Sequence, residues 1–436
     1  MRRRPKHRRT STEPRRRELL QALGIFQRAT PDQLWKLTRP DNQHDKLTRD
    51  NLLDLEEHHL VRIETVREDQ RQVWVLTKRG HGEAKKLLEP KGIRVSALRE
   101  EKYDPVTGEL LGTSYDDHAA AVTSTAAELH RAGIGHRLGF QTEIGHRLGN
   151  SFVQRADLVV RAPEAGVPVM LLEIDRRTED AHELVLKLRR YWEWGRLLPR
   201  DADKHTVDLV RSRPDAIDSV VDHEQRLWRR FYPPTGREGL VPLAFVFADT
   251  TEAKVDNTVA VLEEAGRDYW APRRYRTIHR GITARDYGQA VPVVLTTLEQ
   301  LQEHGADAAV WRRLGRTGEQ KLTAALDNPD GDVLFRDQEA RADAAEEQRR
   351  AAEREERRPV CKRCGRKFTD QRWEETTAHR TAWNAGDVSL CGTCRADDVA
   401  REEAAAEAAR LQAALPPESE NDQEPDRGRG WFRRRT

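Results

Sequence analysis

The chain has 436 residues, of which 34% are charged and 37% are hydrophobic. This length is enough for two or three domains with small cores and extensive surfaces. No apolar run reaches the length of a membrane span, and the basic N-terminus is not followed by the apolar core of a signal peptide. We therefore expect no membrane partner and a cytoplasmic location.

The N-terminus is strongly basic although the net charge of the whole chain is only +2. Residues 1–17 contain nine Lys or Arg residues and a single acidic residue, Glu13. Residues 1–14 are interpreted as a disordered arm, and an arm of this charge indicates a polyanionic partner.

Residues 15–90 have the pattern of a winged-helix DNA-binding domain. Apolar residues at helical spacing predict three helices, and the alternating segments LVRIETV and QVWVLT predict a hairpin. In such a domain the third helix enters the major groove and the hairpin touches the DNA backbone. A domain of this kind that binds protein is the alternative, and the basic arm favours DNA. The candidate DNA contacts are Lys46, Arg49 and Asn51 on the third helix, and Arg67 and Arg71 at the hairpin tip.

After a linker over residues 91–114, residues 115–320 predict a mixed α/β sheet domain. Its expected order is helix, three strands, helix, strand, helix and strand. Two buried strands of this region end in carboxylates. Asp157 opens the apolar run LVV, and the run VPVMLL leads into Glu173 and Asp175. Alternation along a strand places Glu173 and Asp175 on one face.

Three carboxylates so close would repel one another unless a cation or a proton lay among them. Oxygen ligands of this kind suit Mg²⁺ or Mn²⁺. Lys187, on the following helix, either pairs with Glu183 at i,i+4 or reaches back toward the carboxylates. Acidic residues at strand ends also cap helices or face water, and the spacing alone leaves both interpretations open. Glu128, on the helix before the strands, is expected to be a solvated surface residue.

The segment LEIDRRTE, with the later KLRRY, resembles the replication-relaxation family of actinobacterial plasmids and integrated elements. The Asp, strand, acid and helix pattern also resembles the PD-(D/E)XK nuclease-like fold. The likeness covers about residues 12–300, and it implies a winged helix joined to a nuclease-like domain. Active nucleases of this fold usually carry Lys where this chain has Asp175, so the resemblance implies that Lys187 would take that role.

The C-terminal part combines charged helices with all four cysteines of the chain. Residues 321–358 are interpreted as a solvated helical spacer and residues 397–414 as another helix, followed by a disordered tail over residues 415–436. Between them, residues 359–396 contain two Cys-x-x-Cys pairs separated by 26 residues. Four thiolates so arranged favour a structural Zn²⁺ in a zinc ribbon, and a redox dithiol pair is the competing interpretation. The expected zinc ligands are Cys361, Cys364, Cys391 and Cys394.

Together these patterns predict an α+β multidomain protein that binds DNA on a bacterial plasmid or mobile element. The first hypothesis is a metal-dependent endonuclease or nickase with Asp157, Glu173, Asp175 and Lys187 as catalytic residues. Its rival is a replication or transcription factor that uses an inactivated nuclease fold as a DNA clamp. A second copy of the chain or other replication proteins are further candidate partners.

Overall fold

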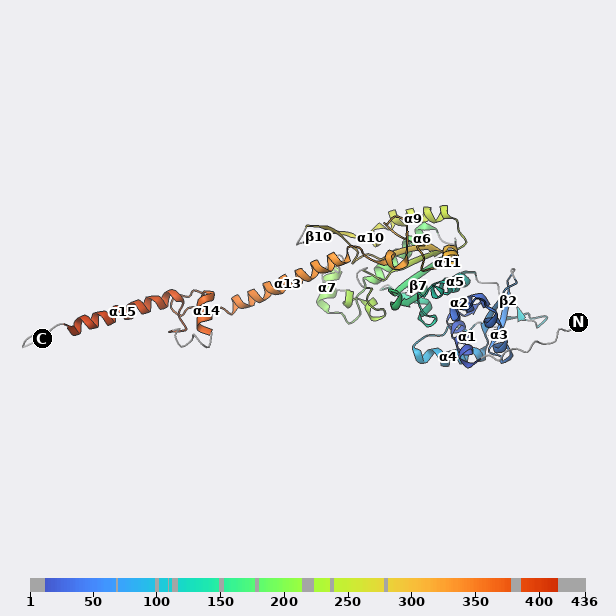
Figure 1. The fold of residues 1–436 in the computed structure, drawn as a ribbon, viewed down its shortest axis with the longest axis horizontal. Coiled ribbons are helices and arrows are strands. Elements are labelled where there is room, and N and C mark those ends of the chain that lie inside the picture. Colours follow the sequence, from blue (N-terminus) through green and yellow to red (C-terminus); the bar gives the residue numbers. More distant parts are fainter. Residues whose placement is uncertain are drawn as a thin grey trace, which may run out of the picture. The chain divides into compact units, whose positions relative to one another are not determined.

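The computed structural model separates into two compact units, Met1–Asp337 and Gln338–Thr436, whose ribbons are drawn in Figure 1. The predicted disordered tail lies outside the described residues, as does the predicted arm up to residue 11. The structure describes residues 12–67, 70–98, 102–108, 110–111, 117–148, 153–176, 180–213, 223–235, 239–277, 281–377 and 386–414.

The first unit begins with an N-terminal module, residues 12–98, that has the predicted order of three helices and a hairpin. Its second helix begins with a capping box between Thr30 and Gln33, and Pro31 occupies the first turn. In the small sheet, β3 lies between β1 and β2. The elements are α1 (Glu13–Phe26), β1 (Arg28–Ala29), α2 (Pro31–Thr38), α3 (Lys46–Glu57), β2 (Val61–Val66), β3 (Gln72–Leu76) and α4 (Lys78–Leu88).

A seven-stranded mixed sheet forms the centre of the rest of the unit, with the strand order β14-β13-β12-β9-β8-β7-β6. The neighbours β8, β9 and β12 run parallel and the other pairs run antiparallel. Helices connect the parallel strands, because a parallel pair needs a long crossover. The sheet strands are β6 (Phe140–Arg147), β7 (Val153–Ala162), β8 (Val167–Asp175), β9 (Leu243–Phe247), β12 (Val293–Thr297), β13 (Trp311–Arg313) and β14 (Glu319–Gln320).

Helices cover both faces of this sheet and bury two apolar clusters. On β8, Leu172 and Ile174 belong to the cluster with α5, whereas Leu171 belongs to the cluster with α6 and α9. Glu173 therefore lies on the α6 face of the sheet. The helices are α5 (Asp117–Arg131), α6 (Ala181–Gly195), α7 (Lys204–Ser212), α9 (Glu252–Ala265), α10 (Arg267–Trp270), α11 (Leu298–His304) and α12 (Leu322–Leu326). Two small antiparallel strand pairs lie outside the main sheet: β4 (Lys102–Tyr103) with β5 (Leu110–Leu111), and β10 (Arg273–Arg276) with β11 (Thr283–Asp286).

The N-terminal module and the sheet share one apolar cluster. The rings of Phe26 and Phe140 lie 6.2 Å apart within it. Beside it, Lys36 Nζ on α2 lies 2.8 Å from Glu128 Oε1 on α5. Glu128 is only 1% exposed, so the expectation of a solvated residue is wrong. The docked module excludes water from Glu128, and Lys36 and Arg131 neutralise its carboxylate.

The second unit consists of helices around the cysteines. Its first helix, α13 (Gly331–Glu356), starts in the first unit, where Leu334 is buried, and is exposed from residue 341 to its end. Then follow α14 (Asp370–Thr377) and α15 (Gly392–Ala414). Among the helices that the structure describes, none combines the length and the apolar character needed to cross a bilayer.

Candidate functional site

Two of the predicted carboxylates lie where strands β7 and β8 separate. The two strands pair up to Leu158 and Leu172, and β8 continues by pairing with β9. Beyond that point the Asp157 carboxylate takes the place of a backbone acceptor. Its Oδ2 accepts a hydrogen bond from the backbone N–H of Ile174 at 2.8 Å, and its Oδ1 lies 3.2 Å from His118 Nε2 on α5. Asp157 thus links two strands and a helix.

Glu173 is almost fully buried, with 1% exposure, and its carboxylate has three side-chain partners. Lys187 Nζ donates to Oε2 at 2.7 Å, Gln154 Nε2 donates to Oε1 at 3.1 Å, and the Tyr191 hydroxyl also donates to Oε1. Burial and, to a smaller extent, the nearby Asp157 carboxylate raise the pKa of Glu173 to about 7, and Lys187 and Tyr191 limit the shift. The site therefore holds a carboxyl group that can exchange a proton near neutral pH.

Helix α6 brings Lys187 to Glu173 because it packs across the end of β8. Asp180 caps this helix by accepting from the backbone N–H of Glu183. Leu184, Leu188 and Tyr191 are buried on one face, and Lys187 lies beside that face, one turn before Tyr191. Of the two partners considered for Lys187, the structure selects Glu173. This places the cation at 2.7 Å from a carboxylate fourteen residues away.

Gln154 and Tyr191 are two site residues that were missed in the sequence. Tyr191 stands in the sequence only as the last residue of the segment KLRRY, and Gln154 belongs to no motif. The spacing of Tyr191, four residues after Lys187, was an available signal, because side chains four apart share a helix face. Gln154 needed the tertiary structure, since its contact with Glu173 crosses from β7 to β8 beyond the point where the two strands stop pairing.

The third predicted carboxylate, Asp175, lies at the end of β8 and is 9% exposed. Within the described residues, the side chains that gather closely enough to hold one ion are four cysteines, and the three carboxylates do not form such a group. The reason is local: Asp157 is engaged by a backbone N–H and His118, and Glu173 by Lys187, Gln154 and Tyr191. A Mg²⁺ or Mn²⁺ site here stays a prediction.

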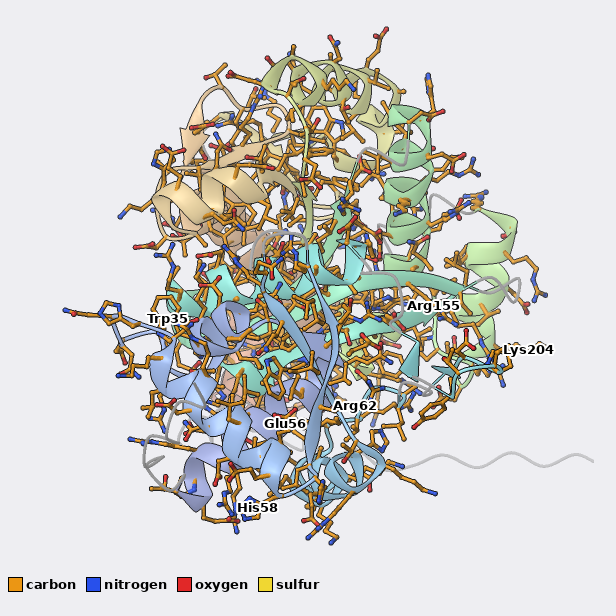
Figure 2. The ribbon with its side chains drawn as sticks, turned by 90° about the vertical axis from the view of Figure 1, so that its right-hand side faces the viewer. Trp35, Glu56, His58, Arg62, Arg155 and Lys204 are labelled. Carbon is orange, nitrogen blue, oxygen red and sulfur yellow. The ribbon has the colours of Figure 1, made fainter. Side chains whose placement is uncertain are left out.

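A groove of about 1100 Å³ lies on the N-terminal module between α2, the start of α3 and the hairpin. Figure 2 shows the module with Trp35 on α2 and His58 at the end of α3. Three predicted DNA contacts, Lys46, Arg49 and Arg71, line this groove and are exposed. Acidic residues also line it, and Arg49 pairs with Asp45 at 2.6 Å. The groove is thus lined by exposed cations and by acidic residues.

The other two predicted DNA contacts lie differently. Asn51 is only 6% exposed and does not line this groove, so its position does not support the predicted DNA contact. Thr48, Asn51 and Leu55 fall on one face of α3 at helical spacing, and that face is buried. Arg67 is half-buried at the start of the turn between β2 and β3, where its backbone N–H donates to the Arg71 carbonyl.

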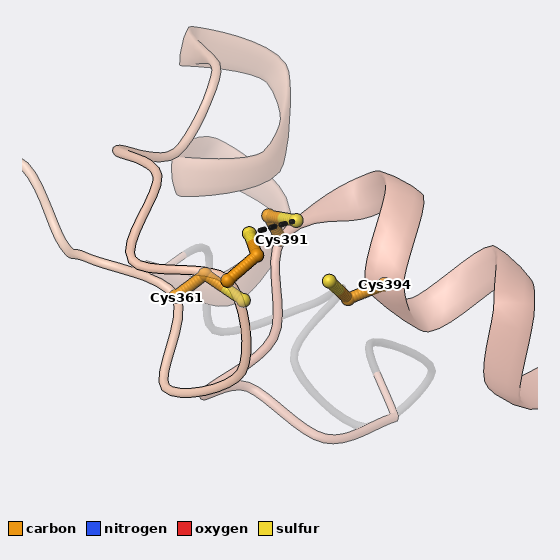
Figure 3. A group of neighbouring side chains, drawn as sticks. Cys361, Cys391 and Cys394 are labelled. Carbon is orange, nitrogen blue, oxygen red and sulfur yellow. Dashed lines mark hydrogen bonds between the residues drawn. The ribbon is translucent and has the colours of Figure 1, made fainter.

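The four cysteines of the second unit form one cluster. Their sulfur atoms all lie within 4.8 Å of one another, and the Cys364 and Cys391 sulfur atoms are 3.7 Å apart. A tetrahedral Zn²⁺ with bonds of about 2.3 Å requires an edge of about 3.8 Å, whereas a disulfide requires about 2.05 Å. The spacing therefore fits four ligands around one ion. Figure 3 shows the side chains of Cys361, Cys391 and Cys394 converging.

The local structure around the cluster explains how the ligands converge. Backbone N–H groups of Cys391 and Cys364 point at the Cys361 sulfur and lower the pKa of that thiol to about 6, which favours a thiolate ligand. Cys391 and Cys394 flank the first turn of α15, where side chains three apart share a face. In the described residues, the cysteines lie beside a bridge between Val360 and Lys367 and at this helix start, and a zinc ribbon stays a prediction.

The comparisons with known proteins agree with the resemblance in the sequence. The model of the replication-relaxation family matches residues 20–206, which include most of the N-terminal module and the strands and helix around Glu173. Neither the curated proteins nor the solved structures contain a match. The chain is thus similar to replication-relaxation proteins over its first half, up to the beginning of α7.

Proposed function

We propose that the protein binds duplex DNA through its N-terminal module and acts in the replication of a plasmid or another mobile element. The observation that carries this proposal is the groove between α3 and the hairpin, lined by exposed Lys46, Arg49 and Arg71. Support also comes from the match to the replication-relaxation family and from the order of three helices and a hairpin, which is that of a winged helix.

The groove suits DNA because its cations are exposed and adjustable. The ion pair between Arg49 and Asp45 is exposed and contributes little stability. It occupies part of a guanidinium that has five N–H donors, so Arg49 can still bind a phosphate or a base edge. Lys46 at the start of α3 and Arg71 at the hairpin would bind phosphates on either side. Release of counterions would then supply much of the affinity.

The test is a salt titration of binding between the full chain and a fluorescent duplex. Changing Arg49→Ala, Lys46→Ala or Arg71→Ala should each reduce the slope of log K against log salt by about 1. Lys85→Ala, an exposed lysine of α4 outside the groove, is the matched control. Equal affinity and slope for all four variants would contradict the proposal.

A metal-dependent endonuclease or nickase is the second candidate function. The observation that favours it is the contact between Lys187 and Glu173 at 2.7 Å, since a cation at this position could stabilise the charge of a phosphodiester. Asp157, Glu173 and Asp175 would be the ligands of Mg²⁺ or Mn²⁺, which would supply Lewis-acid activation. The engagement of Asp157 and Glu173 by other side chains favours instead the DNA clamp without catalysis.

Incubation of supercoiled plasmid with each metal separates the two alternatives. For an endonuclease, wild type should nick or linearise the plasmid, and Lys187→Ala and Asp157→Ala should lose that activity while still binding DNA. Arg189→Ala, on the exposed side of α6, should cut like wild type. Plasmid that wild type binds and leaves intact with both metals would establish the clamp.

A further inference from the structure

The hairpin formed by β10 and β11 is a strongly basic element of the first unit that the groove and the carboxylate site do not use. Three of the four residues of β10 are arginines, and all three are exposed. A fourth arginine, Arg285, lies on β11 directly opposite Arg274. Figure 1 shows β10 projecting from the body of the α/β region.

One face of the hairpin is anchored to the protein. Tyr275 and Ala284 lie opposite each other on that face; the Tyr275 hydroxyl donates to Asp337 Oδ2 at 2.7 Å, and Ala284 is 2% exposed. At the edge, the Arg285 backbone and side chain donate to Asp330 Oδ2 at 2.8 and 3.0 Å. These contacts fix the orientation of the hairpin.

The anchored face determines what the hairpin presents to solvent. Alternation along the strand places Arg274 and Arg276 on the face opposite Tyr275. Arg274 and Arg285 are cross-strand neighbours of like charge, a pairing that destabilises a hairpin. Asp330 forms an ion pair with Arg285 and offsets the charge of that residue. The outward face therefore presents Arg274, Arg276 and Arg285 at a fixed position, and Arg274 and Arg276 are exposed.

We propose that this outward face is a second DNA-contact surface, on which Arg274 and Arg276 bind phosphates of the duplex. The inference rests on the proposed binding of DNA by the protein. A two-stranded ribbon is one of the elements that the major groove admits, and a guanidinium binds a phosphate with two parallel hydrogen bonds. A phosphate beside Arg274 would also relieve its repulsion with Arg285. The hairpin would thus hold the duplex independently of the N-terminal groove.

The test compares two double variants of the full chain in the salt titration with a fluorescent duplex. Arg274→Gln with Arg276→Gln should reduce the salt slope by about 2, at roughly 0.9 per lost phosphate contact, and should weaken binding at low salt by ten-fold or more. Arg200→Gln with Arg211→Gln removes the same charge from two other exposed positions and should bind almost like wild type.

Two further measurements separate loss of contact from loss of structure. The thermal midpoint of the Gln variant should equal or exceed that of wild type, because Arg274→Gln removes the like-charge pair. Arg274→Lys with Arg276→Lys should retain most of the salt slope. Equal slopes for the Gln variant and its control, while Arg49→Ala still weakens binding, would overturn this inference and leave the proposed function standing. Absence of DNA binding by wild type would overturn both.

Discussion

The carboxylate cluster and the cysteine cluster both gather acidic ligands, but they balance their charge in different ways. Around Glu173, the chain itself supplies a cation from Lys187 and hydrogen bonds from Gln154 and Tyr191. In the cysteine cluster, the four sulfur atoms lie within 4.8 Å of one another. A carboxylate that has an internal cation can be stable without a metal, whereas four converging thiolates could be balanced by a bound metal ion.

The two clusters also differ in how much of the protein should depend on them for its stability. Glu173 lies on the central sheet, where its backbone pairs with β9 and its side-chain partners come from β7 and α6, so its loss should affect the whole first unit. The cysteines come from a short stretch of the second unit, and their apolar cluster includes Phe368 and Leu390. A metal ion held by the four cysteines should therefore determine the stability of that module alone.

The largest expected effect comes from removing a cysteine. Cys391→Ser should abolish zinc binding and unfold the module, because a structural zinc contributes on the order of 10 kcal/mol of folding free energy. Elemental analysis should find one zinc per wild-type chain and none in the variant. Limited proteolysis should then cleave the second unit and leave the first intact.

Thr393→Ala is the matched control for that change, because Thr393 is exposed between two of the cysteines. It should retain both the zinc and the resistance to protease. Wild-type protein purified without any bound metal would contradict the distinction between the two clusters.

A smaller loss should follow from Lys187→Met. This change leaves the buried carboxylate of Glu173 without its cation, and breaking a buried pair in this way costs about 3–5 kcal/mol. The free energy of unfolding, measured with denaturant at pH 8, should fall by that amount. Arg189→Met breaks an exposed pair with Glu193 on the same helix and should cost less than about 1 kcal/mol. Similar losses in the two variants would show that Lys187 does not neutralise Glu173.

The smallest effect is a pH dependence of stability. The pKa of Glu173 is raised to about 7 in the folded protein, above its ordinary value of 4.5, so the folded state holds the proton more tightly. This contribution to stability is complete below pH 4.5 and is lost as the pH rises through 7. A shift of this size corresponds to roughly 3 kcal/mol.

Glu173→Gln removes this titration while keeping a hydrogen-bonding group of similar shape. The difference in unfolding free energy between wild type and variant should therefore change between pH 4.5 and 7, with wild type losing relative stability as the pH rises. Parallel stability curves over that interval would show that Glu173 is ionised throughout. Burial would then not raise the pKa of Glu173, and the Glu173 cluster would hold its carboxylate in the charged form over the whole interval.

Local patterns predicted much of the N-terminal module and the sheet. Thr30 and Pro31 indicated the start of α2, and alternating segments indicated β2 and β3. These signals depend only on residues close by in the sequence, so they can be recognised without knowledge of the fold. The prediction that Asn51 contacts DNA also depended on a local property. Its polarity favoured a surface position, although its spacing from Thr48 and Leu55 placed it on the buried face.

The cysteine spacing alone determined which four residues would converge, since each Cys-x-x-Cys pair brings two thiols together through local geometry. The partner of Lys187 and the burial of Glu128 depended on the tertiary structure. Lys187 meets Glu173 because α6 packs across the end of β8, and Glu128 loses its water because the N-terminal module docks on α5. Contacts between residues distant in sequence determine burial, and burial determines how an ionisable group is neutralised.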